Sequence, residues 1–174
     1  MDRDRISLKG LTIVATASDI SWRGPAGTFN LRVAAVITRG DQVLLCTIEG
    51  FEYWFLPGGR VSFGEPSEVA LARELAEELG HDLPGARLAL VAENIFEKQT
   101  LQHEIGLYYR VPWPSTLDPG DLHRGTEYEH IFRWAPLQGL ADLDFRPAGL
   151  IPLLPELTDT LRHVTLYRLD RATP

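Results

Sequence analysis

The 174-residue sequence has few of the features that mark disulfide-linked or membrane-spanning proteins. Its one cysteine, Cys46, excludes an internal disulfide and any metal site that needs several thiolates. Because a chain without disulfides suits a reducing compartment, we expect a cytoplasmic protein. No apolar run approaches the roughly 20 residues that a membrane-spanning helix needs, so we expect no membrane partner.

Basic residues are also in short supply. The chain has 17 Lys and Arg against 24 Asp and Glu, which gives a net charge of −7. This balance argues against stable nucleic-acid binding, because a polyanion is held mainly by Lys and Arg side chains. Hydrophobic residues make up 44% of the chain and charged residues 24%, which is ordinary for one folded domain. An anionic small molecule must therefore be admitted by local chemistry.

Runs of apolar and β-branched residues predict several strands. Residues 31–38 and 42–48 flank the turn sequence Arg39-Gly40-Asp41, which is typical of a hairpin. Further strands are predicted at 86–94, 104–111 and 129–135, and a short helix is predicted to begin within 147–154.

The first 28 residues are predicted to form an N-terminal extension, and residues 29–174 the main domain. Within the extension, 11–17 has strand composition, whereas 21–27 has the glycine and proline of a loop.

Residues 66–79 predict the clearest helix. Pro66 suits its first turn, and Gly80 is placed to end it. Spacings of three and four residues put the carboxylates of Glu74, Glu77 and Glu78 on one face. The opposite, core-facing stripe is predicted to contain Val69, Ala72, Leu75, Ala76 and Leu79.

Three neighbouring carboxylates repel one another, which is a reason to look for a compensating cation. Carboxylate oxygens favour the hard cations magnesium, manganese and calcium. The alternative is a solvated acidic helix face. The preceding Gly58-Gly59 pair and Glu65 favour the functional interpretation, because glycine lets the backbone approach a metal or a phosphate closely.

The segment GRVSFGEPSEVALARELAEELGH, residues 59–81, resembles the signature of the Nudix hydrolases, enzymes that cleave nucleoside diphosphates linked to another moiety. The fixed positions of that signature are occupied here by Gly59, Glu65, Arg73, Glu74, Glu77, Glu78 and Gly80, with Leu75 at the internal hydrophobic position. His81 departs from the aliphatic residue that usually ends the motif, but it replaces no expected metal ligand. We refer to residues 59–81 as the box.

The resemblance implies a single α/β domain in which a mixed β-sheet is sandwiched between helices and the box forms a loop–helix–loop motif. It also implies metal-dependent hydrolysis of a pyrophosphate bond by water attack on phosphorus, with Mg²⁺, or alternatively Mn²⁺, as cofactor. Two other functions stay open: nucleoside triphosphate pyrophosphohydrolase activity, and nucleotide binding with weak catalysis. The substrate is expected to be a nucleotide-derived small molecule.

The resemblance also assigns roles within the box. Glu77 and Glu78 are expected to be the principal metal ligands, and Glu74 a ligand or the general base. The carbonyl of Gly59 is a further candidate ligand. Arg73 is grouped with the catalytic residues Glu74 and Glu77 as the side chain that orients them. Its expected pairing with Glu65 is structural, as is the role of Gly80.

An acidic residue outside the box often completes such a site. Glu127 and Glu129 are the preferred candidates because they follow a proline-rich loop, and Glu104 is a third candidate; ordinary surface charge is the alternative. Arg32 lies in a predicted core strand, where an arginine must be paired if it is buried. It either contacts a substrate phosphate or points to solvent from one strand face.

Aromatic residues precede the box, and Tyr53 and Trp54 are candidates for stacking on a nucleotide base. The alternative is that they fill the core, as aromatics near strands often do. A further hypothesis is a homodimer in which residues 11–17 add a strand to the sheet edge of another subunit.

Overall fold

The computed structural model describes residues 18–114 and 130–168, which form a seven-stranded mixed sheet. The strand order is β6-β3-β2-β5-β4-β7, with β1 paired to β2. The strands are β1 (Ser21–Gly24), β2 (Gly27–Arg39), β3 (Gln42–Ile48), β4 (Arg87–Glu97), β5 (Leu101–Pro112), β6 (His130–Pro136) and β7 (Arg162–Arg168). None of the helices in these two ranges is long and apolar enough to cross a membrane.

Strand β2 is the centre of the sheet. It pairs with β5 in parallel along eleven positions, from Thr28 opposite Gln102 to Thr38 opposite Pro112. Its pairing with β3 is short and antiparallel, which confirms the predicted hairpin around Gly40. Where β2 and β3 separate, residues 55–61 lie between them and hydrogen-bond to both, for example from the Ala35 N–H to the Pro57 carbonyl at 2.8 Å. The start of the box is therefore held inside the sheet.

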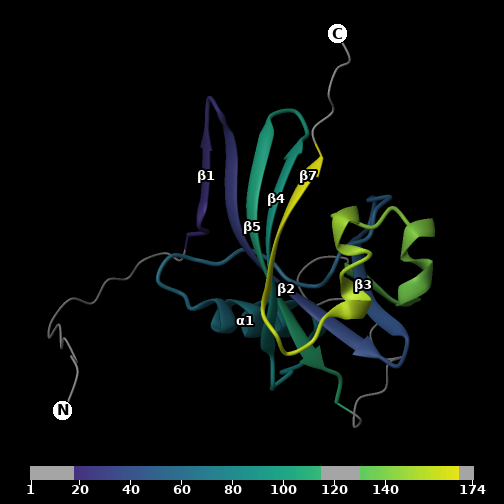
Figure 1. Ribbon diagram of the computed structural model, residues 1–174. Helices are drawn as coiled ribbons and strands as arrows, with labels where there is room; N and C mark the ends of the chain where they lie inside the picture. Colours follow the sequence, from purple (N-terminus) through teal and green to yellow (C-terminus); the bar gives the residue numbers. More distant parts are fainter. Residues whose placement is uncertain (1–17, 115–129, 169–174) are drawn as a thin grey trace, which may run out of the picture.

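The two faces of the sheet have different covers (Figure 1). Helix α1 (Ser67–Leu79) packs on the face that includes Val33 and Ala35. The other face is covered by three short 3₁₀-helices, η2 (Leu137–Asp142), η3 (Ala148–Leu150) and η4 (Leu154–Glu156). The mixed sheet between helices matches the fold expected from the sequence. Strands β1, β2, β5, β4 and β7 extend together past both covers.

Helix α1 has nearly the predicted bounds, but its buried face differs from the predicted one. Pro66 is the N-cap, and Gly80 ends the helix in the left-handed conformation with its N–H donating to the Ala76 carbonyl. The buried residues are Ala70, Leu71, Leu75, Glu78 and Leu79. Val69, Ala72 and Ala76, predicted to face the core, are exposed. The prediction is confirmed for Leu75 and Leu79 and was wrong for the other three, because it placed the core opposite all three carboxylates, whereas Glu78 is buried.

Three other sequence-based assignments need correction. Residues 21–24, predicted as loop, form β1, because the glycine and proline punctuation belongs to the tight turn between β1 and β2. The region 147–154 contains 3₁₀ turns rather than a helix, since Pro152 interrupts it. Strand β7 was not predicted. The expected strand at 11–17 lies outside the described residues.

Candidate active site

Arg73 joins the acidic residues of the box. Its guanidinium donates to both carboxylate oxygens of Glu65, at 2.9 and 3.1 Å, to Glu74 at 2.8 Å and to Glu77 at 3.1 Å. It also donates to the backbone carbonyl of Arg60 at 3.0 Å. The hydrogen bonds from Arg73 lower the pKa of Glu65 and raise that of Arg73. The expected Arg73–Glu65 pair is thus present, and one cation fixes the loop to the helix.

Two glycines allow the loop and the helix to meet. Gly58 has φ of +138°, and a Cβ there would collide with the backbone of Val33 and Ala34. A Cβ on Gly59 would overlap the carboxylate of Glu74. The Gly59 carbonyl accepts the Val33 N–H at 3.0 Å and keeps a second lone pair. Glycine is therefore required at position 58 by the nearby backbone, whereas at position 59 its absence of a side chain leaves room for the Glu74 carboxylate.

Glu78 is the most deeply buried carboxylate of the box, with a side chain 7% exposed. It accepts the backbone N–H of Gly58 at 2.9 Å, and the Nε2 atom of His130 lies 3.5 Å from its other oxygen. Burial raises the pKa of Glu78 to about 8, opposed by the Gly58 N–H and reinforced by the charge of Glu74. Burial also raises the pKa of Glu74, partly offset by Arg73.

The donor chemistry of this cluster suits a divalent cation. Three carboxylates and the Gly59 carbonyl offer only oxygen atoms, which are the ligands of hard cations. Arg73 is the sole cation bonded to Glu74 in the part of the chain that the structure describes, so negative charge is in excess. Within those residues no three acidic, histidine or cysteine side chains already converge as a ligand cluster. Glu74 and Glu77 would have to exchange contacts with Arg73 to bind a metal.

Arg32 lies beside the box, on β2. Its side chain is half-buried, and its backbone forms an isolated antiparallel β-bridge with Arg60, the residue after Gly59. Its charge acts to lower the pKa of Glu74 and Glu78. Its side chain forms no hydrogen bond or ion pair with another described residue. Arg32 is therefore a half-buried cation available to an anionic ligand.

A family model described as the NUDIX domain matches residues 28–157. The chain belongs to the Nudix family. The solved structure of the MutT protein from Bacillus halodurans is similar in fold, with a TM-score of 0.58 at 17% identity, over 80% of this chain and 90% of that one. The MutT NUDIX hydrolase from Burkholderia pseudomallei is 30% identical, with a TM-score of 0.53, over 63% of this chain and 84% of that one.

Two curated relatives of this Nudix chain carry different substrate names. "Putative ADP-ribose pyrophosphatase YjhB" from Bacillus subtilis is 28% identical over 63% of this chain and 52% of its own length. "Putative 8-oxo-dGTP diphosphatase 2" from Mycobacterium tuberculosis is 52% identical over 28% of this chain and 37% of its own length. The chain thus spans about half or less of the length of these curated relatives.

Asn30 and Asn94, near the Nudix box, were missed by sequence reasoning, whereas their partner Glu104 was a candidate for the acidic residue outside the box. Asn30, Glu104 and Asn94 are aligned across β2, β5 and β4. The Asn30 amide donates to one carboxylate oxygen of Glu104 at 3.3 Å, and the Asn94 amide lies 3.5 Å from the other. Arg60 donates to Asn30 at 3.2 Å, which connects this row to the box. No local motif marks this row, because strand pairing brings it together, parallel between β2 and β5 and antiparallel between β4 and β5.

The other candidates lie farther from the Nudix carboxylates or outside the described residues. The Tyr53 ring lies under Arg146 at 4.3 Å and the Trp54 ring under Arg133 at 5.2 Å. Trp54 also packs against the buried cluster beneath the 3₁₀-helices, so it fills space in the core. Glu127 and Glu129 fall outside the described ranges. Cys46 is buried, as expected, and burial raises the pKa of its thiol.

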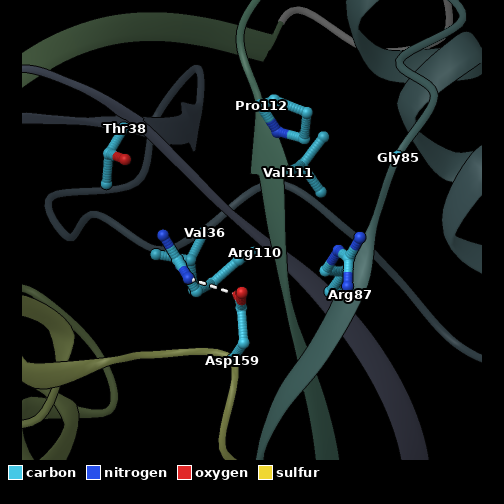
Figure 2. A pocket seen from close by; sticks show the side chains of 8 residues that line it. All are labelled: Val36, Thr38, Gly85, Arg87, Arg110, Val111, Pro112 and Asp159. Atoms are coloured by element: carbon cyan, nitrogen blue, oxygen red, sulfur yellow. Dashed lines mark hydrogen bonds and ion pairs between the residues drawn. The ribbon is translucent and has the colours of Figure 1, made fainter.

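A cavity of about 200 Å³ lies away from the Nudix box, at the ends of β2 and β5 (Figure 2). Arg87 and Arg110 face each other across β4 and β5, and Asp159 pairs with Arg110 at 2.7 Å. Arg87 is exposed and has no ion pair with another described residue. This Arg pocket is a second charged region of the molecule, with the opposite sign.

Proposed function

We propose that this chain hydrolyses a pyrophosphate bond in a nucleoside diphosphate linked to another moiety, with the assistance of a divalent metal. The observation that carries the proposal is the excess of buried carboxylates in the box. Among the described residues, the partners of buried Glu78 are the Gly58 N–H and His130, and Glu74 lies against Gly59. Such a site needs a compensating positive charge. Membership of the Nudix family supports a catalytic divalent metal as the source of that charge.

Each residue of the site is assigned a separate role in the reaction. Glu77, Glu78 and the Gly59 carbonyl would hold Mg²⁺, or alternatively Mn²⁺. When bound, this ion neutralises pyrophosphate oxygens and lowers the pKa of an attacking water. Glu74 either joins the ligands or takes the proton of the water. Arg73 positions Glu74 and Glu77, and Arg32 holds a phosphate of the substrate.

Two substrate classes are carried by the names of the relatives. An ADP-ribose pyrophosphatase cleaves a nucleotide linked to a second sugar, whereas an 8-oxo-dGTP diphosphatase acts on a nucleoside triphosphate. The first class is our main proposal and the second our alternative. A nucleotide-binding module with weak catalysis is disfavoured by the complete acidic set of the box.

The proposal also covers the organisation of the chain. Residues 29–174 would act as the catalytic domain, supported by a family match that begins at residue 28, with 1–28 as an extension whose β1 joins the sheet. The single cysteine supports a cytoplasmic location. A homodimer through 11–17 rests on the strand composition of that range alone.

The test is turnover of a substrate panel with magnesium. The panel contains nucleoside triphosphates, ADP-ribose, dinucleoside polyphosphates, NADH and nucleotide sugars, with products separated by ion exchange. Glu77→Gln and Glu78→Gln should each lower kcat by at least about 100-fold, because a ligand to the metal is lost. Glu68→Gln, on the exposed first turn of α1, is the matched control and should keep full activity.

Two results would contradict the proposal. Full activity of Glu77→Gln and Glu78→Gln would show that the box does not hold the catalytic metal. Tight nucleotide binding without turnover, in magnesium and in manganese, would favour the binding module.

A further inference from the structure

The sheet face beside Arg32 has one position that carries no side chain of its own. Arg32 is aligned with Gly106 of β5, which has no side chain to fill this position. The ring of Tyr108, the next residue of β5 on the same face, lies over Gly106 so closely that a Cβ there would overlap it. No described residue hydrogen-bonds to the Tyr108 hydroxyl. The Tyr108 ring therefore covers Gly106, and its hydroxyl, which no described residue binds, lies in the row next to Arg32.

Glu104 lies one row farther along the same face of the sheet. It precedes Gly106 by two residues, so the two positions share a face and lie about 7 Å apart along the strand. Asn30 and Asn94 are buried, and each directs its amide to a different oxygen of the half-buried Glu104 carboxylate. Two buried side chains thus fix the orientation of a carboxylate that stays partly accessible.

The charges of these groups act on one another. The charge of Arg32 acts to lower the pKa of Tyr108, whereas that of Glu104 acts to raise it, although burial is the largest cause of its raised value. The same arginine acts on Glu74 and Glu78 of the box. The strand register places Arg32 and Gly106 in one row of this face and Asn30 and Glu104 in the neighbouring row.

We infer that Glu104 determines specificity by accepting hydrogen bonds from the vicinal hydroxyls of a sugar joined to the pyrophosphate. This inference rests on the proposed function, which places a phosphate at Arg32. A carboxylate accepts hydrogen bonds and repels phosphate, so its partner on a nucleotide must be a donor. At about 7 Å from the arginine row, the sugar that follows the phosphate is the donor within reach. Hydroxyl-to-carboxylate contacts of this kind are how acidic residues recognise a ribose.

The vicinal hydroxyls have two sources, the nucleoside ribose and a second sugar. Three substrates separate them: ADP-ribose, its 2′-deoxyadenosine counterpart and the methyl ester of ADP, which lacks the second sugar. We expect Glu104→Gln to raise KM for ADP-ribose about 10- to 100-fold with little change in kcat, the range for losing a charged hydrogen bond. If Glu104 binds the ribose of the nucleoside, the substitution should leave only the KM for the 2′-deoxyadenosine substrate unchanged. If Glu104 binds the second sugar, the substitution should leave only the KM for the methyl ester of ADP unchanged.

The control is Glu93→Gln on β4. Glu93 is aligned with Ile105, so it points to the opposite face of the sheet, where His163 lies 3.4 Å away. It should leave all three KM values unchanged. Glu104→Asp is the second variant. It keeps the charge but withdraws the carboxylate, and it should lose the same discrimination if Glu104→Gln does not fold.

Three results would overturn the inference. An equal fall in kcat on all three substrates would make Glu104 the acidic residue that completes the catalytic site. Unchanged KM values in both Glu104 variants would show that it does not contact substrate, and an equal effect of Glu93→Gln would show a general effect on the sheet. If the wild type cleaves none of the substrates, calorimetric binding of an ADP-ribose analogue with a methylene bridge tests Glu104 separately. Equal binding by wild type and Glu104→Gln then overturns the inference, and binding weakened about 10-fold or more supports it.

Discussion

The box and the Arg pocket are charged regions of opposite composition. In the box, one arginine serves three carboxylates, Glu65, Glu74 and Glu77. In the Arg pocket, one carboxylate, Asp159, lies with two arginines, and it pairs with only one of them (Figure 2).

Burial separates the two regions more than charge does. The side chains of Glu65 and Glu74 are 14% and 16% exposed, whereas those of Arg110 and Asp159 are 42% and 68% exposed. Water solvates the excess charge of the Arg pocket, so its ion pair contributes little. In the box, desolvation shifts proton affinities and leaves a demand for a cation. In this molecule, excess charge therefore indicates a reactive site where solvent is excluded and not where the charged side chains are exposed.

The largest expected effect comes from filling the close approach in the box. Gly58→Ala should lower the free energy of unfolding by about 4 kcal/mol, because its positive φ is strained for alanine and its Cβ would meet the β2 backbone. Gly40→Ala, in the hairpin turn with φ of +60° and open space around it, should lower it by only about 1 kcal/mol. Urea unfolding measures both. Equal losses would show that the contact of Gly58 with β2 contributes nothing.

The next effect is a pH dependence specific to the box. Without metal, the folded protein holds a proton on Glu78 between about pH 4.5 and 8, while the unfolded chain has released it. The free energy of unfolding should therefore fall as pH rises through this window, by an amount on the order of 3 kcal/mol. Glu65, with its lowered pKa, acts oppositely, and its contribution is lost as pH falls below about 4.5.

Urea unfolding in a chelator, at steps from pH 5 to pH 8, measures this dependence. Glu78→Gln should flatten it, and saturating magnesium should reduce it by holding the carboxylates ionised. A wild-type stability that rises with pH over this window would show that Glu78 is ionised in the metal-free protein.

The smallest effect compares the two arginines directly. Arg73→Ala should lower the free energy of unfolding by about 2 kcal/mol, because it leaves partly buried carboxylates without a donor. Arg110→Ala should cost less than about 1 kcal/mol, as expected for an exposed pair. Thermal or urea unfolding distinguishes the values. Equal costs would mean that burial does not separate the box from the Arg pocket.

Local signals made the box and the helix predictable. Proline and glycine limits set the ends of α1, and the Gly58-Gly59 pair preceded an acidic pattern with a fixed spacing. The pairing of Arg73 with Glu65 followed from the same pattern. These features depend on residues within about 20 positions of each other, so periodicity and turn chemistry are enough to find them.

Features that depend on strand order were not predictable in the same way. Asn30 and Glu104 are 74 residues apart in the chain and meet only because β2 and β5 are parallel. The burial of Glu78 contradicts the usual preference of glutamate for solvent and depends on the loop that lies over it. Gly106 has no sequence signal either, because its role comes from the ring of Tyr108.

The parallel pairing of β2 with β5 also affects when the site is assembled during synthesis. Strand β2 ends at Arg39, but its partner is complete only at Pro112, so a nascent chain holds the box and α1 before the central pairing exists. Closing so long a loop is slow compared with forming a helix or a hairpin. Until β5 has been synthesised, β2 lacks its parallel partner, and the glutamates of α1 are not yet held in their final positions. The nascent chain therefore passes through an interval in which protection from aggregation depends on its negative charge or on a chaperone.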